Sequence, residues 1–281
     1  TEFAVVEYEN DVYVLGGEQT IMGGPLKTVL KYNEEVNNKW IELPPMEYSR
    51  DPIVAALVGG DEIYVMGSLT KTIAIYTIQT SRWRVGPAIN SGARGYGTNG
   101  VVVTNNGNII LTGRTETKLL DTKNVNYGWQ QLPKLNTPRD YHSAVLVGNT
   151  IVVMGGWAHD GGEILASVET LDLNKAVPSK QGGFGSWKTV SNLTIPREAF
   201  SAKVIGEHIV LVGGKQQNGV PLASLEFVHA NKLLNGTAEF GILTPKLKQP
   251  RWNSGLALAV GGDSLLVIGG RTRTEGGFGT Y

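Results

Sequence analysis

The stretch Val12-Tyr13-Val14-Leu15-Gly16-Gly17 is an apolar segment that ends in a glycine pair, and close relatives of it recur along the chain. The first glycines of these segments, at positions 16, 67, 113, 155, 213 and 269, lie about 50 residues apart. The copies are Val12–Gly17, Ile63–Ser68, Ile109–Arg114, Ile151–Gly156, Ile209–Gly214 and Leu265–Gly270. A period of this length predicts an array of similar structural units.

Each copy belongs to a larger unit with three further short apolar segments. A segment rich in small residues, such as Ser143–Val147, precedes the glycine pair, and a segment such as Val29–Tyr32 follows it. The last segment begins with a tryptophan in four repeats, at Trp40, Trp83, Trp129 and Trp187. Four short strands separated by turn residues are typical of one propeller blade. No window has a sustained apolar period of 3.6 residues, so we expect little helix.

The composition excludes several classes of function. The 25 basic and 25 acidic side chains cancel, so no net charge favours nucleic acid or an anionic membrane surface. Absence of cysteine excludes disulfides and thiolate chemistry, and it suits a reducing compartment such as the cytoplasm without excluding secretion. No apolar run approaches the roughly 20 residues that span a bilayer.

The order of apolar strand, Gly-Gly, Tyr, Trp and then Pro-Arg resembles the kelch family over essentially the whole chain. The resemblance implies an all-β, six-bladed kelch-type β-propeller whose blades are four-stranded and antiparallel. Departures are local: Ser68 and Arg114 replace second glycines, and Phe227 and Phe240 replace the Tyr and Trp of repeat five.

The repeats predict a single propeller domain over residues 1–281. The blades are expected at about 1–46, 47–89, 90–135, 136–195, 196–247 and 248–281. Within this chain the sixth blade is expected to be incomplete, because its third strand should begin where the sequence stops, at Tyr281. We therefore expect that its two outer strands come from residues before Thr1 or after Tyr281.

The second-to-third strand loops and the links between blades should emerge on one face, which by the resemblance is the face that kelch proteins commonly use for partners. These loops are long in repeats one, four, five and six, and short in repeats two and three. Trp and Arg are enriched at binding hot spots. The candidate partner-binding residues in these loops are Trp157, His159, Lys215, Gln217, Arg271, Arg273 and Phe278. The alternative is that Trp157 packs over its own blade and that the arginines are merely solvated.

A second candidate set consists of one arginine just before the first strand of most repeats: Arg50, Arg94, Arg139, Arg197 and Arg251. A ring of guanidinium groups would select a carboxylate-bearing ligand, because Arg binds carboxylates through two parallel hydrogen bonds. A residue repeated in every blade more often serves the repeat itself, and each arginine is then expected to bond neighbouring backbone carbonyls.

These features favour a module that binds another protein or peptide, for which the arginines suggest an acidic character, with no nucleic acid, membrane, cofactor or metal. The copper radical oxidases of this fold need a Cys–Tyr pair, which a chain without cysteine cannot form. The alternative function is a carbohydrate-binding or sugar-isomerising propeller with an axial pocket, because such a site needs only a few polar groups.

Overall fold

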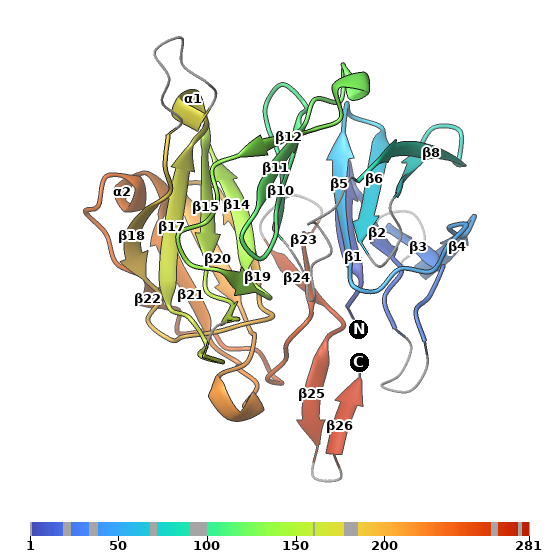
Figure 1. Ribbon diagram of the computed structural model, residues 1–281. Coiled ribbons are helices and arrows are strands. Elements are labelled where there is room, and N and C mark those ends of the chain that lie inside the picture. Colours follow the sequence, from blue (N-terminus) through green and yellow to red (C-terminus); the bar gives the residue numbers. More distant parts are fainter. Residues whose placement is uncertain are drawn as a thin grey trace.

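The computed structural model describes residues 2–18, 24–33, 39–67, 72–89, 100–159, 161–176, 185–259, 264–274 and 277–280. These residues form antiparallel sheets built from strands that are adjacent in sequence (Figure 1). The chain is an all-β propeller with four-stranded antiparallel blades, as its repeats predict. No helix in the described part of the chain is long and apolar enough to cross a bilayer.

Five complete blades follow one another along the chain. The first two are β1 (Ala4–Tyr8), β2 (Asp11–Leu15), β3 (Val29–Asn33) and β4 (Lys39–Leu43), then β5 (Ile53–Val58), β6 (Glu62–Gly67), β7 (Thr72–Thr77) and β8 (Arg82–Ala88). The third is β9 (Gly100–Val103), β10 (Ile109–Thr112), β11 (Thr117–Leu120) and β12 (Trp129–Leu132). The fourth is β14 (Ser143–Val147), β15 (Thr150–Met154), β17 (Ser167–Asp172) and β18 (Lys188–Asn192). The fifth is β19 (Ser201–Ile205), β20 (His208–Val212), β21 (Leu225–His229) and β22 (Gly241–Ile242).

The sixth repeat forms a smaller sheet. Among the described residues this sheet has two strands, β23 (Gly255–Leu258) and β24 (Leu265–Ile268). The first strand of each sheet contacts the first strand of the next, and β23 contacts both β19 and β1. The first strands therefore surround a common axis.

Two small two-stranded sheets lie outside the blades. β13 (Arg139–Asp140), in the link before the fourth blade, pairs with β16 (Trp157–Ala158), in that blade's second-to-third connection. β25 (Arg271–Thr274) pairs with β26 (Gly277–Thr280). Both strands lie within residues 271–280, the expected second-to-third loop of repeat six. In the described part of the chain, helix is limited to α1 (Leu173–Ala176), α2 (Ala230–Leu234) and two 3-10 turns, η1 (Val125–Tyr127) and η2 (Gln217–Gly219).

The glycine pairs allow each blade to meet the link that leads into the next blade and the link that enters the blade itself. Gly155 has a φ of +57°, and a Cβ built there would lie 2.6 Å from the carbonyl oxygen of Arg197. At Gly156, with a φ of +98°, the Cβ would lie 2.6 Å from the carbonyl oxygen of Asp140. Only glycine tolerates both the left-handed backbone and this contact. The spacing of these pairs along the chain therefore marks where neighbouring blades join.

The tryptophans of the fourth strands reach back to the preceding blade. Trp187 is 3% exposed and donates from Nε1 to the carbonyl oxygen of Pro133 at 2.9 Å. Trp83 makes the same bond to Pro44 at 2.8 Å. Trp40, in the first blade, is 45% exposed. The preceding sheet is β23–β24, in which the described residues form no outer strands that could cover it.

The difference in burial between Trp187 and Trp40 predicts that replacing each by alanine lowers the free energy of unfolding by a different amount. Trp187→Ala should lower the free energy of unfolding by about 3–5 kcal/mol, because it leaves a cavity between two blades and an unpaired carbonyl. Trp40→Ala should cost about 1–2 kcal/mol, because the residue is 45% exposed and its ring packs only on Tyr32 of its own blade among the ring contacts of the described residues. Urea unfolding followed by far-UV circular dichroism would measure both, and equal losses would contradict the inter-blade role of Trp187.

Candidate binding face

The second-to-third connections and the blade links lie at one end of the sheets. In Figure 1, β25 and β26 extend from the lower end of the view, and α1, in a third-to-fourth connection, lies at the upper end. Second-to-third and third-to-fourth connections lie at opposite ends of a sheet, because each antiparallel strand reverses the direction of the chain. The lower end of the view is therefore the face on which the candidate residues were expected.

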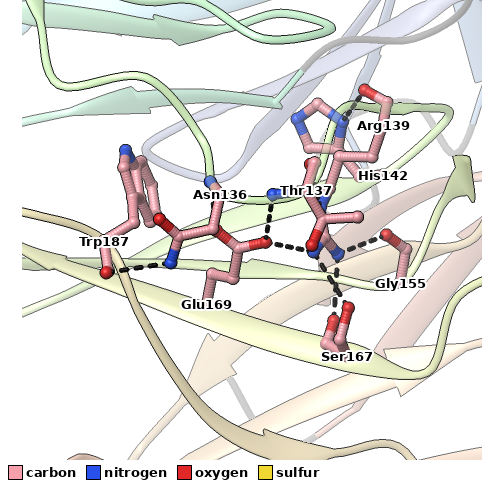
Figure 2. Close-up of polar contacts among 8 residues, drawn as sticks. All are labelled: Asn136, Thr137, Arg139, His142, Gly155, Ser167, Glu169 and Trp187. Carbon is pink, nitrogen blue, oxygen red and sulfur yellow. Dashed lines mark hydrogen bonds and ion pairs between the residues drawn. The ribbon is translucent and has the colours of Figure 1, made fainter. Parts of the chain in front are cut away.

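The repeated arginines lie inside the blades. Arg139 is fully buried and donates from Nη1 to the carbonyl oxygens of Gly155 and Ser167 at 2.8 and 2.9 Å (Figure 2). Its Nη2 forms an ion pair with Glu169 Oε1 at 2.5 Å. The carboxylate of Glu169 also accepts from the backbone N–H groups of Asn136 and Thr137. The charge pair is thus fully hydrogen-bonded, the condition under which buried ions are tolerated.

The fifth blade repeats this arrangement. Arg197 donates from Nη1 to Gly213 O at 2.7 Å and forms an ion pair from Nη2 to Glu226 Oε1 at 2.6 Å. The carboxylate of Glu226 accepts from the backbone N–H groups of Thr194 and Ile195. Burial lowers the pKa of both Arg139 and Arg197, and the carboxylate beside each opposes this shift.

Two other arginines keep the contact to the glycine pair. Arg50 is buried and donates to the carbonyl oxygens of Gly67 and Thr72, and Ala74 stands where the fourth and fifth blades have glutamate. Arg251 donates from Nη1 to Gly269 O at 2.7 Å. Of the two roles considered for the arginine set, Arg50, Arg139 and Arg197 take the structural one, whereas Arg251 also bonds a backbone carbonyl but stays partly exposed. Arg94 lies outside the described residues. Arg50, Arg139 and Arg197 do not contribute to an exposed surface.

The glutamate partners were missed in the sequence, although a signal for them exists. Ser167 and Glu169 in the fourth blade match Ser224 and Glu226 in the fifth, at the start of the third strand. Ser-x-Glu at this place, in a repeat that has the Pro-Arg link, would have predicted the ion pair.

Breaking one ion pair should be costly. Glu169→Ala leaves a buried guanidinium without its counter-charge and should lower the free energy of unfolding by about 3–5 kcal/mol. The double variant Arg139→Met/Glu169→Leu should cost less than the single variant, because it removes both buried charges. Urea unfolding of the two proteins provides the comparison, and a larger loss in the double variant would contradict this account.

The fourth blade brings Trp157 and His159 together with residues from the third blade and the link. The half-buried Trp157 ring meets the His159 ring edge-on at 5.7 Å between centroids. His159 is 42% exposed, and its Nε2 lies 3.1 Å from Arg114 Nη1. Arg114 Nε donates to Asp140 Oδ2 at 3.2 Å. The sequence signal for Arg114 was its place in the glycine pair, which was interpreted only as a departure from the repeat.

The fifth-blade connection supports the fourth-blade connection. The side chain of Gln217 accepts from the backbone N–H of Ile164 at 3.3 Å and donates to Gly162 O at 3.2 Å. Lys215 forms an ion pair with Glu198 at 3.3 Å, and its ammonium group lies 5.9 Å from the centre of the Trp252 ring. Neighbouring connections on this face therefore hold one another.

Arg271 joins the sixth repeat to the first. Its Nη2 lies 2.6 Å from Glu18 and 3.5 Å from Glu2, and its backbone pairs with that of Trp252. Arg273 and Phe278 are register partners across the hairpin, and their side chains lie outside the described part of the chain.

A cavity of about 210 Å³ lies on the axis, lined by the first strands of all six sheets and the links before them. His142 lies in its wall, fully buried (Figure 2). Burial and the nearby charge of Arg139 lower the pKa of His142 to about 3. The ring is therefore neutral, and its Nε2 accepts from the Gly100 N–H while Nδ1 donates to Arg139 O. His142 thus ties the third blade to the fourth.

Three carboxyl groups gather at the mouth of the axis near the first and second blades. Burial and the neighbouring Glu2 and Glu18 raise the pKa of Asp51 to about 8. Asp51 therefore holds a proton in the folded chain between about pH 4 and pH 8, where an unfolded aspartate does not. Because the folded state binds more protons in this window, stability falls as pH rises through it.

Asp51→Asn should remove this pH dependence. The stability difference between variant and wild type should grow from pH 5 to pH 8, by less than about 1.4 kcal/mol per pH unit because solvent screens the repulsion. Urea unfolding at pH 5, 6.5 and 8 would measure it. Asp61→Asn, in a turn at the opposite face, is the control, and an equal pH response in both variants would refute the carboxyl cluster.

Comparisons with known proteins agree with the fold. A sequence model of the Kelch motif matches residues 1–47 and 138–194. Kelch-like protein terF of Aspergillus terreus is 26% identical over 247 residues, which cover 79% of this chain and 51% of that protein. Human Kelch-like protein 34 is 31% identical over 158 residues, which cover 54% of this chain and 23% of that protein. The chain thus spans about half the length of the first relative and less of the second.

A solved structure entitled "Structure of YjhT" superposes with a TM-score of 0.76 at 16% identity, covering 100% of this chain and 93% of the other. This likeness concerns the fold. The repeats, the Kelch-motif match and the relatives together define the class: a β-propeller with kelch repeats that is similar to the kelch-repeat family. Members of this family generally serve as modules that bind other proteins.

Proposed function

We propose that this protein binds a partner protein or peptide through the face that carries the second-to-third connections and the blade links. The observation that carries the proposal is the group formed by Trp157 and His159, which is accessible to solvent and held by β16, Arg114 and the Gln217 loop. A rigid, partly exposed aromatic side chain on a fixed scaffold is the usual anchor of a protein interface.

The proposed contact surface consists of the candidate residues at this face: Trp157, His159, Lys215, Gln217, Arg271, Arg273, Phe278 and, at its edge, Arg251. The buried arginines Arg50, Arg139 and Arg197 are left out because their donors are used inside the blades. The hypothesis of an acidic ligand depended on that arginine ring and loses its support with it.

The axial cavity favours protein binding over the carbohydrate alternative. Its volume of about 210 Å³ is below the roughly 300–1,000 Å³ usual for small-molecule sites. Its wall is formed largely by the first strands, with small side chains such as Ala55, Ala144 and Ala202.

We also propose that the propeller has six blades, with β23 and β24 as the inner half of the sixth. Contacts of β23 with both β19 and β1 support this proposal. The exposed Trp40 supports it too, because the equivalent Trp83 and Trp187 pack toward the preceding blade.

The binding proposal is tested with peptides selected from a random display library against the immobilised protein. Trp157→Ala should weaken the selected peptides by about 30-fold, the loss of roughly 2 kcal/mol expected at a hot spot. Trp40→Ala removes a tryptophan that lies away from the face and should leave the dissociation constant unchanged. Fluorescence anisotropy with labelled peptides measures both, and equal affinity of Trp157→Ala and wild type would refute the site.

A further inference from the structure

The axial mouth of the proposed binding face is lined by carboxylates, a feature that the sequence did not reveal. Tyr141, a half-buried residue with a φ of +54°, lies among four of them. Burial, followed by the charges of Glu2, Glu198, Asp140 and Asp51, raises the pKa of the Tyr141 phenol. These acids come from the links before four different first strands, so the closed ring of blades alone brings them together.

The described cations do not balance these acids. Arg271 pairs with Glu2 and Glu18, Lys215 with Glu198, and Arg114 with Asp140. Asp51 forms no ion pair within the described ranges, and its neighbours Glu2 and Glu18 are themselves acidic. Four carboxylates (Glu2, Glu18, Asp140 and Glu198) and the protonated Asp51 therefore face three cationic side chains among the described residues. An incoming positive charge would relieve this repulsion, and an incoming negative charge would increase it.

Buried polar atoms at the same mouth have no hydrogen-bond partner. Ser254, which lines the cavity, is 8% exposed, and its Oγ is unpaired. Asp140 is 1% exposed, and its Oδ1 is unpaired although its Oδ2 binds Arg114. Asn253 Oδ1 is a buried acceptor in the same condition. Such atoms are rare in folded proteins, and these acceptors require a donor.

We propose that this mouth, here named the acidic mouth (Glu2, Glu18, Asp51, Asp140, Tyr141 and Glu198), receives a lysine or arginine side chain of the bound partner segment. This inference rests on the proposed binding function of the same face and specifies the partner's chemistry. The cation supplies the missing charge and several N–H donors. The face of the Tyr141 ring adds an attraction for a cation, as in other aromatic sites for ammonium and guanidinium groups.

Two other ligands fit the mouth less well. The described residues contain no group of three or more acidic, histidine or cysteine side chains arranged to hold a metal ion, which disfavours a simple divalent cation. An acidic segment would meet Glu2, Asp51 and Asp140 without an uncommitted described cation, since Arg271, Lys215 and Arg114 are already paired.

The amino-acid composition of the peptides selected from the display library tests the proposal. Selection on wild type at moderate ionic strength should enrich Lys and Arg at one position of the selected peptides, with depletion of Asp and Glu there. Replacing that residue with citrulline, which keeps the shape of arginine without its charge, should weaken binding by about tenfold or more.

Charge variants of the protein supply the second measurement. At pH 8.5, where Asp51 is ionised, Asp51→Asn and Glu18→Gln should each weaken the basic peptides about fivefold to tenfold. Lys215→Gln, which leaves Glu198 without its cation, should strengthen them. Glu207→Gln is the matched control, because Glu207 is exposed in the β19–β20 turn at the opposite face. Circular dichroism of each variant confirms folding, and Asp51→Asn is expected to be at least as stable as wild type.

The outcomes separate the two proposals. If the selected peptides bind Trp157→Ala more weakly but carry no basic residue, the acidic-mouth proposal is wrong and the binding-face proposal holds. The same conclusion follows if they bind Asp51→Asn and Glu18→Gln as tightly as wild type. Enrichment of acidic residues likewise overturns it. Failure to select any peptide contradicts both proposals.

Discussion

The structure depends on the close approach between each glycine pair and the link that enters the next blade. At Gly155 and Gly156 the backbone adopts positive φ values, and a side chain at either position would collide with a carbonyl oxygen of a neighbouring link. In the fourth and fifth blades a buried arginine from the link that enters the same blade also binds the carbonyl oxygen of the first glycine. Without this approach the first strands could not surround one axis.

The contact between the links and the glycine pairs also positions the proposed binding face. Because the links are fixed against the glycine pairs, the residues that follow each repeated arginine are brought to the axial mouth from separate blades. Asp140 and Tyr141 follow Arg139, and Glu198 follows Arg197. The guanidinium groups stabilise the blades from inside, while their neighbours in sequence face the opening. The short link segment around each repeated arginine therefore stabilises a blade and also contributes residues to the acidic mouth.

The sequence was informative for features that every repeat shares and less so for features of single repeats. Glycine pairs and tryptophans recur because each blade must solve the same packing problem, so their spacing predicted the sheets and their strands. Trp157 and His159 were found because they follow a glycine pair directly, and the structure brings them together. Arg114 and Glu169 were missed, since each takes part in a contact between segments distant in sequence.

The sequence by itself determined the all-β class, the four-strand repeat and the face on which long connections gather, because these follow from local strand period and turn chemistry. Only the tertiary structure decided the roles of the charges. Arg50, Arg139 and Arg197, which resemble part of a ligand-binding ring in sequence, are buried. Their role was not visible in the sequence, because their carbonyl and carboxylate partners lie up to 30 residues away along the chain. The carboxylates around Tyr141 become one site only when the ring of first strands brings Glu2 near residues from other blades.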